Sequence, residues 1–159
     1  MAAVVTSVNA SPTGGVPKPP VLFARLHATG VDGDRQNNLK YHGGPMRAVC
    51  LYSQDRIDAL NDEGHPITPG SIGENVTIRG LDWDMIVPGV RLAIGDVIRL
   101  EVTEYTVPCN KIADSFVRAD ILRVGQKANP GWSRVYTKVL AEGVVSVGDA
   151  VRVLTKDEA

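Results

Sequence analysis

The sequence predicts a mainly β protein, built as a closed or nearly closed barrel with a few short peripheral helices. Sixteen glycines and ten prolines divide the 159 residues into short runs rich in Val, Ile and Leu, which is typical of many strands joined by tight turns. Within several runs apolar and charged residues alternate, as in Ile98-Arg99-Leu100-Glu101-Val102, so the apolar side chains share one face of a half-buried strand. No change in composition and no linker divides the chain, and we expect one domain over 1–159 with its core at about 5–154.

The predicted strands follow one another with little intervening helix. They cover residues 3–8, 21–28, 47–52, 75–78, 90–94, 97–104, 134–141 and 150–154. Residues 89–100 resemble residues 143–154, and each segment is expected to form a strand, a Gly-Asp turn and a second strand. We expect two equivalent hairpins in one sheet, and closure of that sheet would remove open strand edges.

One longer helix is predicted between two of the strands. Ser53 can cap a helix that runs to about Asn61, because its hydroxyl can accept a hydrogen bond from a free backbone N–H group. Ile57 and Leu60 fall on one face of this helix, and Gly64 is expected to end it.

Net charge and hydropathy argue against two classes of partner. The formal net charge is -1, whereas a protein that binds nucleic acid through its phosphates normally carries a strong basic excess. No apolar stretch approaches the ~20 residues needed to span a bilayer, and the first residues lack the basic and apolar regions of a signal peptide. We therefore expect a cytoplasmic protein that binds a small-molecule substrate or cofactor, with neither nucleic acid nor a membrane as partner.

Three glycine-rich polar segments are candidates for a binding site. Residues 14–18 end in Lys18, beside which backbone N–H groups could hold a phosphate, although a simple turn with a solvated lysine explains the pattern more economically. Residues 33–44 are polar at nearly every position and fit a binding loop and a solvated loop equally well. Residues 69–75 form a tight turn that ends in Glu and Asn, two residue types that strands disfavour.

Cys109 is the strongest candidate for a chemical centre. Pro108 ends the preceding strand, and a short helix is expected after Cys109. At the start of a helix the free N–H groups lower the pKa of a thiol, and Lys111 would add to this effect. The thiolate is the form that attacks, carries sulfur or binds a soft metal, and an inert buried cysteine is the open alternative. The residues of this helix expected to face inward are Ile112, Phe116 and Val117.

Cys50 contrasts with Cys109. It lies among Ala48, Val49 and Leu51 and is predicted to be a small buried hydrophobic residue. Neither cysteine has a second Cys or His at the spacing of a zinc finger, so a structural zinc site is not expected.

Taken in order, these segments resemble the MOSC domain family, named for the C-terminal domain of molybdenum-cofactor sulfurases. The resemblance covers almost the whole chain, from about residue 5 to residue 154. The matching pieces are Gly-Gly-Val-Pro-Lys at 14–18, Gly-Asp-Arg-Gln at 33–36, His-Gly-Gly-Pro at 42–45, Arg-Ala-Val at 47–49, Pro-Gly-Ser-Ile-Gly-Glu-Asn at 69–75, Gly-Asp at 95–96, and Cys109 after a strand. The resemblance implies a β-barrel-like fold, in agreement with the strand pattern, and a pocket around Cys109.

The resemblance also implies a cofactor and a set of site residues. In relatives the matching cysteine carries sulfur or ligates molybdenum in a pterin cofactor, so Cys109 would be the catalytic residue and the molybdenum ligand. The residues that would bind the molybdenum cofactor (molybdopterin) are Lys18, Arg35, Gln36, His42, Gly43, Gly44, Glu74, Asn75 and Lys111. Two-part relatives commonly carry an arginine where Glu74 stands, and a carboxylate there would disfavour an anionic cofactor. Pyridoxal phosphate is associated with the family only through a desulfurase domain, which these 159 residues do not resemble.

Three functions follow from this resemblance as hypotheses. Some stand-alone members are linked to reduction of N-hydroxylated bases and related compounds, which implies a molybdenum-dependent reductase supplied by a separate electron-donor protein. The alternative is a carrier in which Cys109 holds persulfide sulfur from a sulfur-donor protein, or a module that binds and transfers the cofactor. A purely structural barrel is the third hypothesis, and it predicts that Cys109→Ser is harmless.

Overall fold

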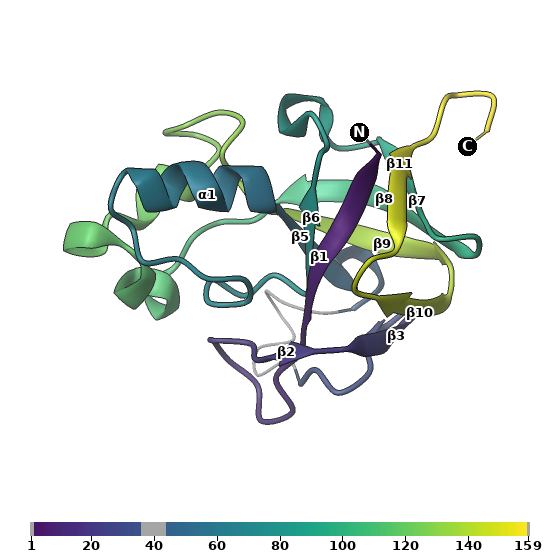
Figure 1. The fold of residues 1–159 in the computed structure, drawn as a ribbon, viewed down its shortest axis with the longest axis horizontal. Coiled ribbons are helices and arrows are strands. Elements are labelled where there is room, and N and C mark those ends of the chain that lie inside the picture. The colour runs from purple at the N-terminus through teal and green to yellow at the C-terminus, as the bar shows by residue number, and fades with distance from the viewer. Residues whose placement is uncertain (1, 36–43, 159) are drawn as a thin grey trace.

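The computed structural model describes residues 2–35 and 44–158, and a closed ring of strands forms its body (Figure 1). In order around the ring, the strands are β1 (Ala3–Asn9), β6 (Val76–Arg79), β5 (Val49–Ser53), β9 (Val135–Ala141), β8 (Ile98–Tyr105), β7 (Arg91–Ile94) and β11 (Ala150–Val153). The ring closes because β11 pairs with both β7 and β1. Neighbouring strands are antiparallel except for β5 and β6, which are parallel. The predicted mainly β, closed barrel is therefore confirmed.

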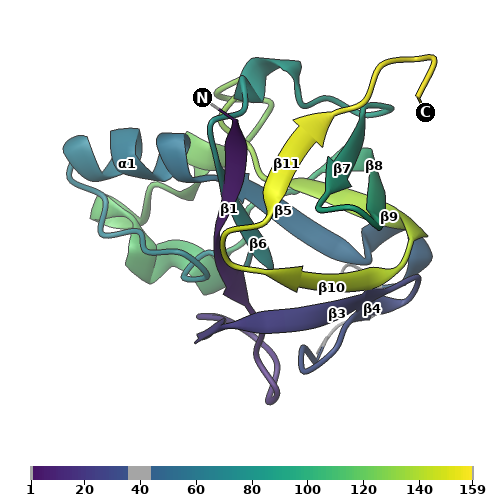
Figure 2. The ribbon, with the colours of Figure 1, turned by 45° about the vertical axis from the view of Figure 1, so that its right-hand side comes forward.

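A smaller sheet lies beside this ring. It consists of β10 (Gly143–Ser146), β3 (Phe23–His27) and β4 (Gly30–Val31), in that order. Figure 2 shows β3 and β10 running across the lower edge of the barrel. A two-residue strand, β2 (Pro20–Val21), pairs with the end of β1 and leads into β3.

The two Gly-Asp segments are not equivalent, which corrects one prediction. β7 and β8 form the expected hairpin, but β10 pairs with β3 and β11 pairs with β7 and β1. The second turn connects β10 and β11, which do not pair with each other, and it is hydrogen-bonded to β1. The Gly148 N–H donates to the Val5 carbonyl at 2.8 Å, and the Val5 N–H donates to the Asp149 carbonyl at 2.9 Å. The same sequence pattern therefore makes a hairpin in one place and a corner between two sheets in the other.

The predicted helix is present as α1 (Gln54–Asp62). The Ser53 hydroxyl accepts a hydrogen bond from the Arg56 N–H at 3.0 Å, as expected of a cap. Ile57 and Leu60 are fully buried against the barrel, and Gly64 follows the helix in the left-handed region with φ +102°.

The segment after Cys109 forms short 3-10 turns. They are η3 (Asn110–Ser115), η4 (Val117–Ala119) and η5 (Ile121–Val124), while η1 (Pro45–Arg47) and η2 (Trp83–Met85) lie elsewhere. Ile112 and Phe116 are buried as predicted, but Val117 is 44% exposed. The physical reason is that Phe116 adopts an extended backbone, which interrupts the helical turn and directs the following residue outward.

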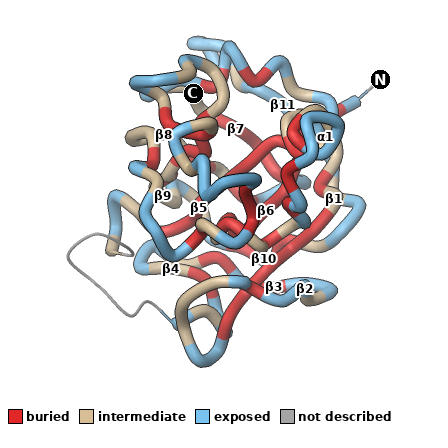
Figure 3. Tube along the Cα trace, turned by 90° about the vertical axis from the view of Figure 1, so that its left-hand side faces the viewer, coloured by how far each residue is buried: buried red, intermediate tan, exposed pale blue. Residues whose placement is uncertain are grey.

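One hydrophobic core joins the ring, the smaller sheet and α1. Figure 3 shows buried positions along β1, β5 and β6 and extending into the smaller sheet. Leu26 and Val31 of the smaller sheet belong to the same buried cluster as Leu51, Ile78 and Leu100 of the ring. Within the described ranges, no helix combines the length and the apolar content that crossing a bilayer requires.

Candidate active site

A pocket opens beside the ends of β5, β6 and β9. Its walls come from the loop between β1 and β2, the turn before β6, the segment after β8 and the start of β9. The predicted site residues that line it are Lys18, Asn75, Cys109 and Lys111. Arg134, Tyr136 and Cys50 also line it, and the first two are not among the candidate site residues expected from the sequence.

Cys109 is exposed at this pocket, which makes its thiol accessible. It immediately precedes η3, and its own backbone is extended. The Cys109 carbonyl accepts a hydrogen bond from the Ile112 N–H at 3.2 Å, whereas its side chain makes no capping bond. Lys111 is exposed on the same short turn and makes no ion pair with any described residue. The thiol and this ammonium group therefore line the same pocket, and neither forms an ion pair or side-chain hydrogen bond within residues 2–35 and 44–158.

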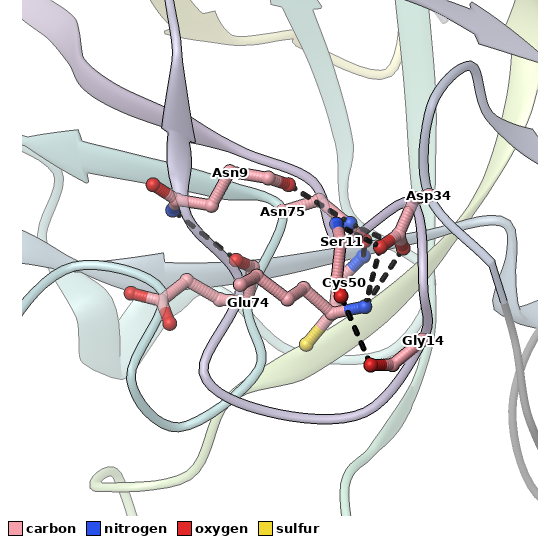
Figure 4. Close-up of polar contacts among 8 residues, drawn as sticks. Asn9, Ser11, Gly14, Asp34, Cys50, Glu74 and Asn75 are labelled. Atoms are coloured by element: carbon pink, nitrogen blue, oxygen red, sulfur yellow. Dashed lines mark hydrogen bonds and ion pairs between the residues drawn. The ribbon is translucent and has the colours of Figure 1, made fainter.

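Lys18 is buried and bonded to a carboxylate that the sequence analysis did not single out. Its ammonium group donates to both Asp34 oxygens, at 2.7 and 2.8 Å. The Asp34 side chain is fully buried and also accepts from the Ser11 backbone N–H at 2.8 Å. Figure 4 shows this carboxylate at the centre of the polar contacts around the loop between β1 and β2. Because Lys18 and Asp34 neutralise each other, Lys18 forms part of the pocket wall but adds little positive charge to the pocket.

Asn75 connects three parts of the chain with its side-chain amide. The oxygen accepts from the Cys50 N–H at 3.0 Å, and the nitrogen donates to the Asn9 carbonyl at 3.2 Å and to Asp34 at 2.9 Å. These bonds join the start of β5, the end of β1 and the Gly33-Asp34 turn. They explain why an amide stands just before β6, where strand propensity alone disfavours it.

Cys50 behaves as the sequence predicted. Its side chain is buried, and burial raises the pKa of its thiol to about 12. The thiol therefore remains neutral near physiological pH and is a poor nucleophile.

Arg134 is a buried cation without a carboxylate partner among the described residues. Only 7% of the residue is exposed, and it lines the pocket. One terminal nitrogen donates to the Ile72 carbonyl at 2.6 Å, while the Nε atom is buried without a hydrogen-bond partner in the described structure. A buried guanidinium group that lacks a counter-charge and has an unbonded nitrogen favours binding of an anionic ligand nearby.

Tyr136 lies two residues along β9 from Arg134 and lines the same pocket. The alternation of β9 places both residues on one face, opposite the buried Val135 and Thr137. Burial raises the pKa of the Tyr136 phenol, so the hydroxyl stays protonated at physiological pH. The period of two in residues 134–141 was the one sequence signal that could have grouped these two side chains.

Glu74 lies behind the pocket and does not line it. The residue is completely buried, and one of its oxygens accepts from the Thr77 hydroxyl at 3.0 Å. The other oxygen has no hydrogen-bond partner in the described structure, and burial raises the pKa of this carboxyl to about 7. The carboxylate expected to repel an anionic cofactor is therefore held away from the pocket surface.

The remaining candidates from the sequence lie elsewhere or outside the described residues. Arg35 is exposed, and neither it nor Gly44 is among the residues that line the pocket. Gln36, His42 and Gly43 fall within 36–43, outside the described residues. No group of three or more His, Cys, Asp or Glu side chains in residues 2–35 and 44–158 is arranged to hold a metal ion by itself.

Comparison with known proteins identifies relatives of this chain. The chain is 33% identical over 153 residues to the uncharacterized protein YflK of Bacillus subtilis (strain 168), a match that covers 92% of this chain and 65% of YflK. It is 31% identical over 134 residues to a protein named "Reductase" from Gibberella moniliformis, covering 81% of this chain and 23% of that protein. The chain thus spans less than two thirds of the length of both curated relatives.

A solved structure shares the fold. The crystal structure of YiiM from Geobacillus stearothermophilus superimposes with a TM-score of 0.70 at 25% identity, covering 97% of this chain and 76% of that one. The family model described as the MOSC domain matches residues 38–152. The chain therefore belongs to the MOSC domain family.

Proposed function

We propose that this protein is a molybdenum-cofactor-dependent reductase of N-hydroxylated compounds, with Cys109 as the protein ligand to molybdenum. The observation that carries the proposal is one pocket that combines an exposed thiol with a buried guanidinium group that forms no ion pair with any described residue. A soft thiolate suits molybdenum, and a guanidinium group suits the phosphate of a pterin cofactor. Membership of a family associated with molybdenum-cofactor proteins, and similarity to a protein named "Reductase", support the same assignment.

The pocket residues fit an anionic cofactor. Arg134 and Lys111 contribute positive charge that no described carboxylate neutralises through an ion pair. Gly73 lines the pocket with φ +96°, and a Cβ atom there would come within 3.1 Å of the Val16 side chain. A side chain at this position would crowd Val16 and strain the backbone, so the close-packed pocket wall requires glycine here. The Glu74 carboxylate does not line the pocket, so it acts on an anion there only through space.

The reaction divides between the cofactor and the residues of this chain. Reduction of R–NHOH takes up two electrons and two protons, breaks the N–O bond, and gives R–NH₂ and water. When bound, the molybdenum cofactor would supply the electrons, which it would receive from a separate electron-donor protein. Cys109 would hold the metal, and Arg134 and Lys111 would bind the anionic part of the cofactor. The Tyr136 phenol stays protonated and can donate a hydrogen bond to the substrate oxygen.

The experiment compares wild type with Cys109→Ala, both purified from a host that makes the cofactor. Molybdenum and pterin contents are measured first, and reduction of an N-hydroxylated base is then followed with an artificial reductant. We expect wild type to hold both components and to turn over, and Cys109→Ala to lose molybdenum and activity with an unchanged circular dichroism spectrum. Cys50→Ala serves as the cysteine control and should retain molybdenum. A cofactor-loaded wild type that leaves N-hydroxylated compounds unreduced would refute the assignment.

The exposure of Cys109 favours a second candidate, a sulfur carrier. A thiol at the surface can accept sulfur from a donor protein, whereas a buried thiol cannot. Incubation with cysteine and a cysteine desulfurase, followed by mass spectrometry, tests this function. A carrier would gain the mass of one sulfur atom at Cys109 and would do so without molybdenum. If Cys109 and Cys50 stay unmodified, the carrier function is excluded.

A further inference from the structure

Arg134 and Glu74 are two oppositely charged groups that lie behind and beside the pocket without bonding to each other. Arg134 donates to the carbonyl of Ile72, two residues before Glu74. The Nε atom of Arg134 and one carboxyl oxygen of Glu74 are both buried, and neither has a hydrogen-bond partner in the described structure. The charge of Arg134 nevertheless acts on Glu74, because it lowers the pKa that burial raises. The two groups therefore interact electrostatically, but no hydrogen bond joins them.

The neighbouring buried ion pair of Lys18 and Asp34 does not provide a counter-charge for Arg134 or Glu74. Lys18 and Asp34 are joined directly at 2.7 and 2.8 Å, so their charges cancel at short range. Figure 4 shows the Glu74 carboxylate directed away from Asp34. No salt bridge joins Arg134 to a carboxylate in residues 2–35 and 44–158. The charge that can offset Arg134 through space at this place is therefore the carboxylate of Glu74.

We propose that Glu74 controls the charge of the pocket, so that binding of an oxyanion at Arg134 is coupled to uptake of a proton by Glu74. When Glu74 is ionised, it offsets Arg134 and repels an incoming anion. When Glu74 is protonated, the guanidinium charge is left for the anion. Because the two equilibria are linked, protonation raises anion affinity by the same factor by which anion binding raises the proton affinity of Glu74.

The other titratable groups around Glu74 keep one charge state near neutral pH. Cys50 and Tyr52 of β5 both interact electrostatically with Glu74, and burial raises the pKa of each, so both stay neutral. Thr77 of β6 donates a hydrogen bond and does not titrate in this range. Arg134, which immediately precedes β9, supplies the positive charge beside Glu74. The Glu74 carboxyl, with a pKa of about 7, is the group of this cluster whose charge changes there.

The inference deepens the proposed function, since the same oxyanion position would hold the anionic part of the cofactor, but its test needs no cofactor. Sulfate is a suitable probe because its charge is constant between about pH 5.5 and about pH 8.5. Sulfate is titrated into cofactor-free protein at fixed ionic strength, and NMR follows the amide resonances of Gly73 and Arg134. The side-chain carboxyl resonance of Glu74 is recorded in the same samples.

We expect the affinity of wild type for sulfate to fall roughly 10-fold from about pH 5.5 to about pH 8.5. Glu74→Gln keeps the shape of the side chain and removes its titration, so it should bind sulfate with the same affinity throughout. Glu63→Gln is the matched control: Glu63 is exposed and paired with Arg123, and its substitution should leave the pH dependence of wild type intact. Saturating sulfate should also move the midpoint of the Glu74 carboxyl titration to higher pH.

Three outcomes would overturn the inference. They are absence of sulfate binding at every pH, a pH-independent affinity in wild type, and a Glu74 titration midpoint that sulfate does not move. The last measurement uses wild type alone, so the test does not depend on whether Glu74→Gln folds. Because these experiments contain no molybdenum, their failure leaves the role of Cys109 to be judged by the cofactor analysis, and the two proposals can fail separately.

Discussion

Two cysteines line one pocket and have opposite environments. Cys50 is 6% exposed, and its thiol is kept neutral by burial, whereas Cys109 is exposed. Flanking residues already separate the two, because Cys50 lies within an apolar run and Cys109 follows a proline at the end of a strand. At the scale of single residues, accessibility therefore favours Cys109 over Cys50 as the reactive thiol that we propose for this pocket.

Glu74 should make the free energy of unfolding depend on pH. Its pKa is about 7 in the folded state, above the ordinary value of 4.5, so the folded protein holds this proton more strongly than the unfolded chain. The folded state binds more protons between these two values, and stability therefore falls as pH rises through this window. From the raised pKa we expect the free energy of unfolding of wild type to fall by about 3 kcal/mol as the pH rises through this window. Glu74→Gln has no carboxyl to titrate at this position, so its free energy of unfolding should change little over the same range.

Urea unfolding at about pH 5 and about pH 8 measures this difference. Glu63→Gln again provides the comparison, because its exposed carboxyl has a lowered pKa and is already ionised across the window. Parallel pH profiles for wild type and Glu74→Gln would show that the buried carboxyl does not titrate as described.

At the scale of elements, a buried ion pair fastens the Gly33-Asp34 turn to the barrel. Asp34 accepts hydrogen bonds from Lys18 and the backbone of Ser11, both in the loop between β1 and β2, and from Asn75 just before β6. Asp34→Asn keeps the size of the side chain but leaves the Lys18 ammonium buried without an opposite charge. We expect a loss of about 3 kcal/mol in unfolding free energy, because breaking a buried pair from one side leaves an uncompensated charge.

A nearby aspartate supplies the control for this prediction. Asp32 pairs with His27 at 2.7 Å, but 62% of its side chain is exposed. Asp32→Asn should therefore cost less than about 1 kcal/mol. Chemical denaturation of the two variants under identical conditions compares them directly. Equal small losses would mean that water reaches Lys18 and that the pair does not fasten the turn.

What could be predicted from sequence depended on how far apart the interacting residues are. The cap of α1 and its buried face involve residues within a few positions of one another, so local rules located the helix closely. Arg134 is held by the carbonyl of Ile72, 62 residues away, and no local pattern points to that contact. Asp34 belongs to the Gly-Asp-Arg-Gln motif, but its partner Lys18 lies in another segment, so no local pattern reveals the ion pair.

The same limit explains the error in strand pairing. Residues 89–100 and 143–154 share their spacing of apolar residues and their Gly-Asp turn, and both contain the predicted strands. Pairing, however, is decided by which strand lies alongside, and Val5 of β1 binds the second turn through two backbone hydrogen bonds. Periodicity predicts that a segment is a strand, whereas its partner depends on closure of the whole ring.

At the scale of the molecule, the ring and the smaller sheet share one core. Val145 of β10 is fully buried in the same cluster as Leu100 and Val102 of β8. The fluorescence of Trp83 reports on the ring of strands, because its side chain packs against Tyr52 of β5 with ring centroids 5.9 Å apart. Trp132, the second tryptophan, lies in the same region, because its carbonyl accepts a hydrogen bond from the Tyr52 hydroxyl. If the chain is one cooperative unit, loosening the smaller sheet must also change the unfolding transition that these two tryptophans report.

Val145→Ala tests this cooperativity, with Val144→Ala as its matched control. Removing the two buried methyl groups of Val145 should lower the free energy of unfolding by about 2 kcal/mol. Val144 is 46% exposed on the same strand, so its truncation should change stability by less than about 0.5 kcal/mol. Tryptophan fluorescence and far-ultraviolet circular dichroism should give coincident urea transitions in both variants, with the midpoint lowered in Val145→Ala. If Val145→Ala shifts the circular dichroism transition while the fluorescence transition stays in place, the smaller sheet unfolds separately and the single-domain prediction is wrong.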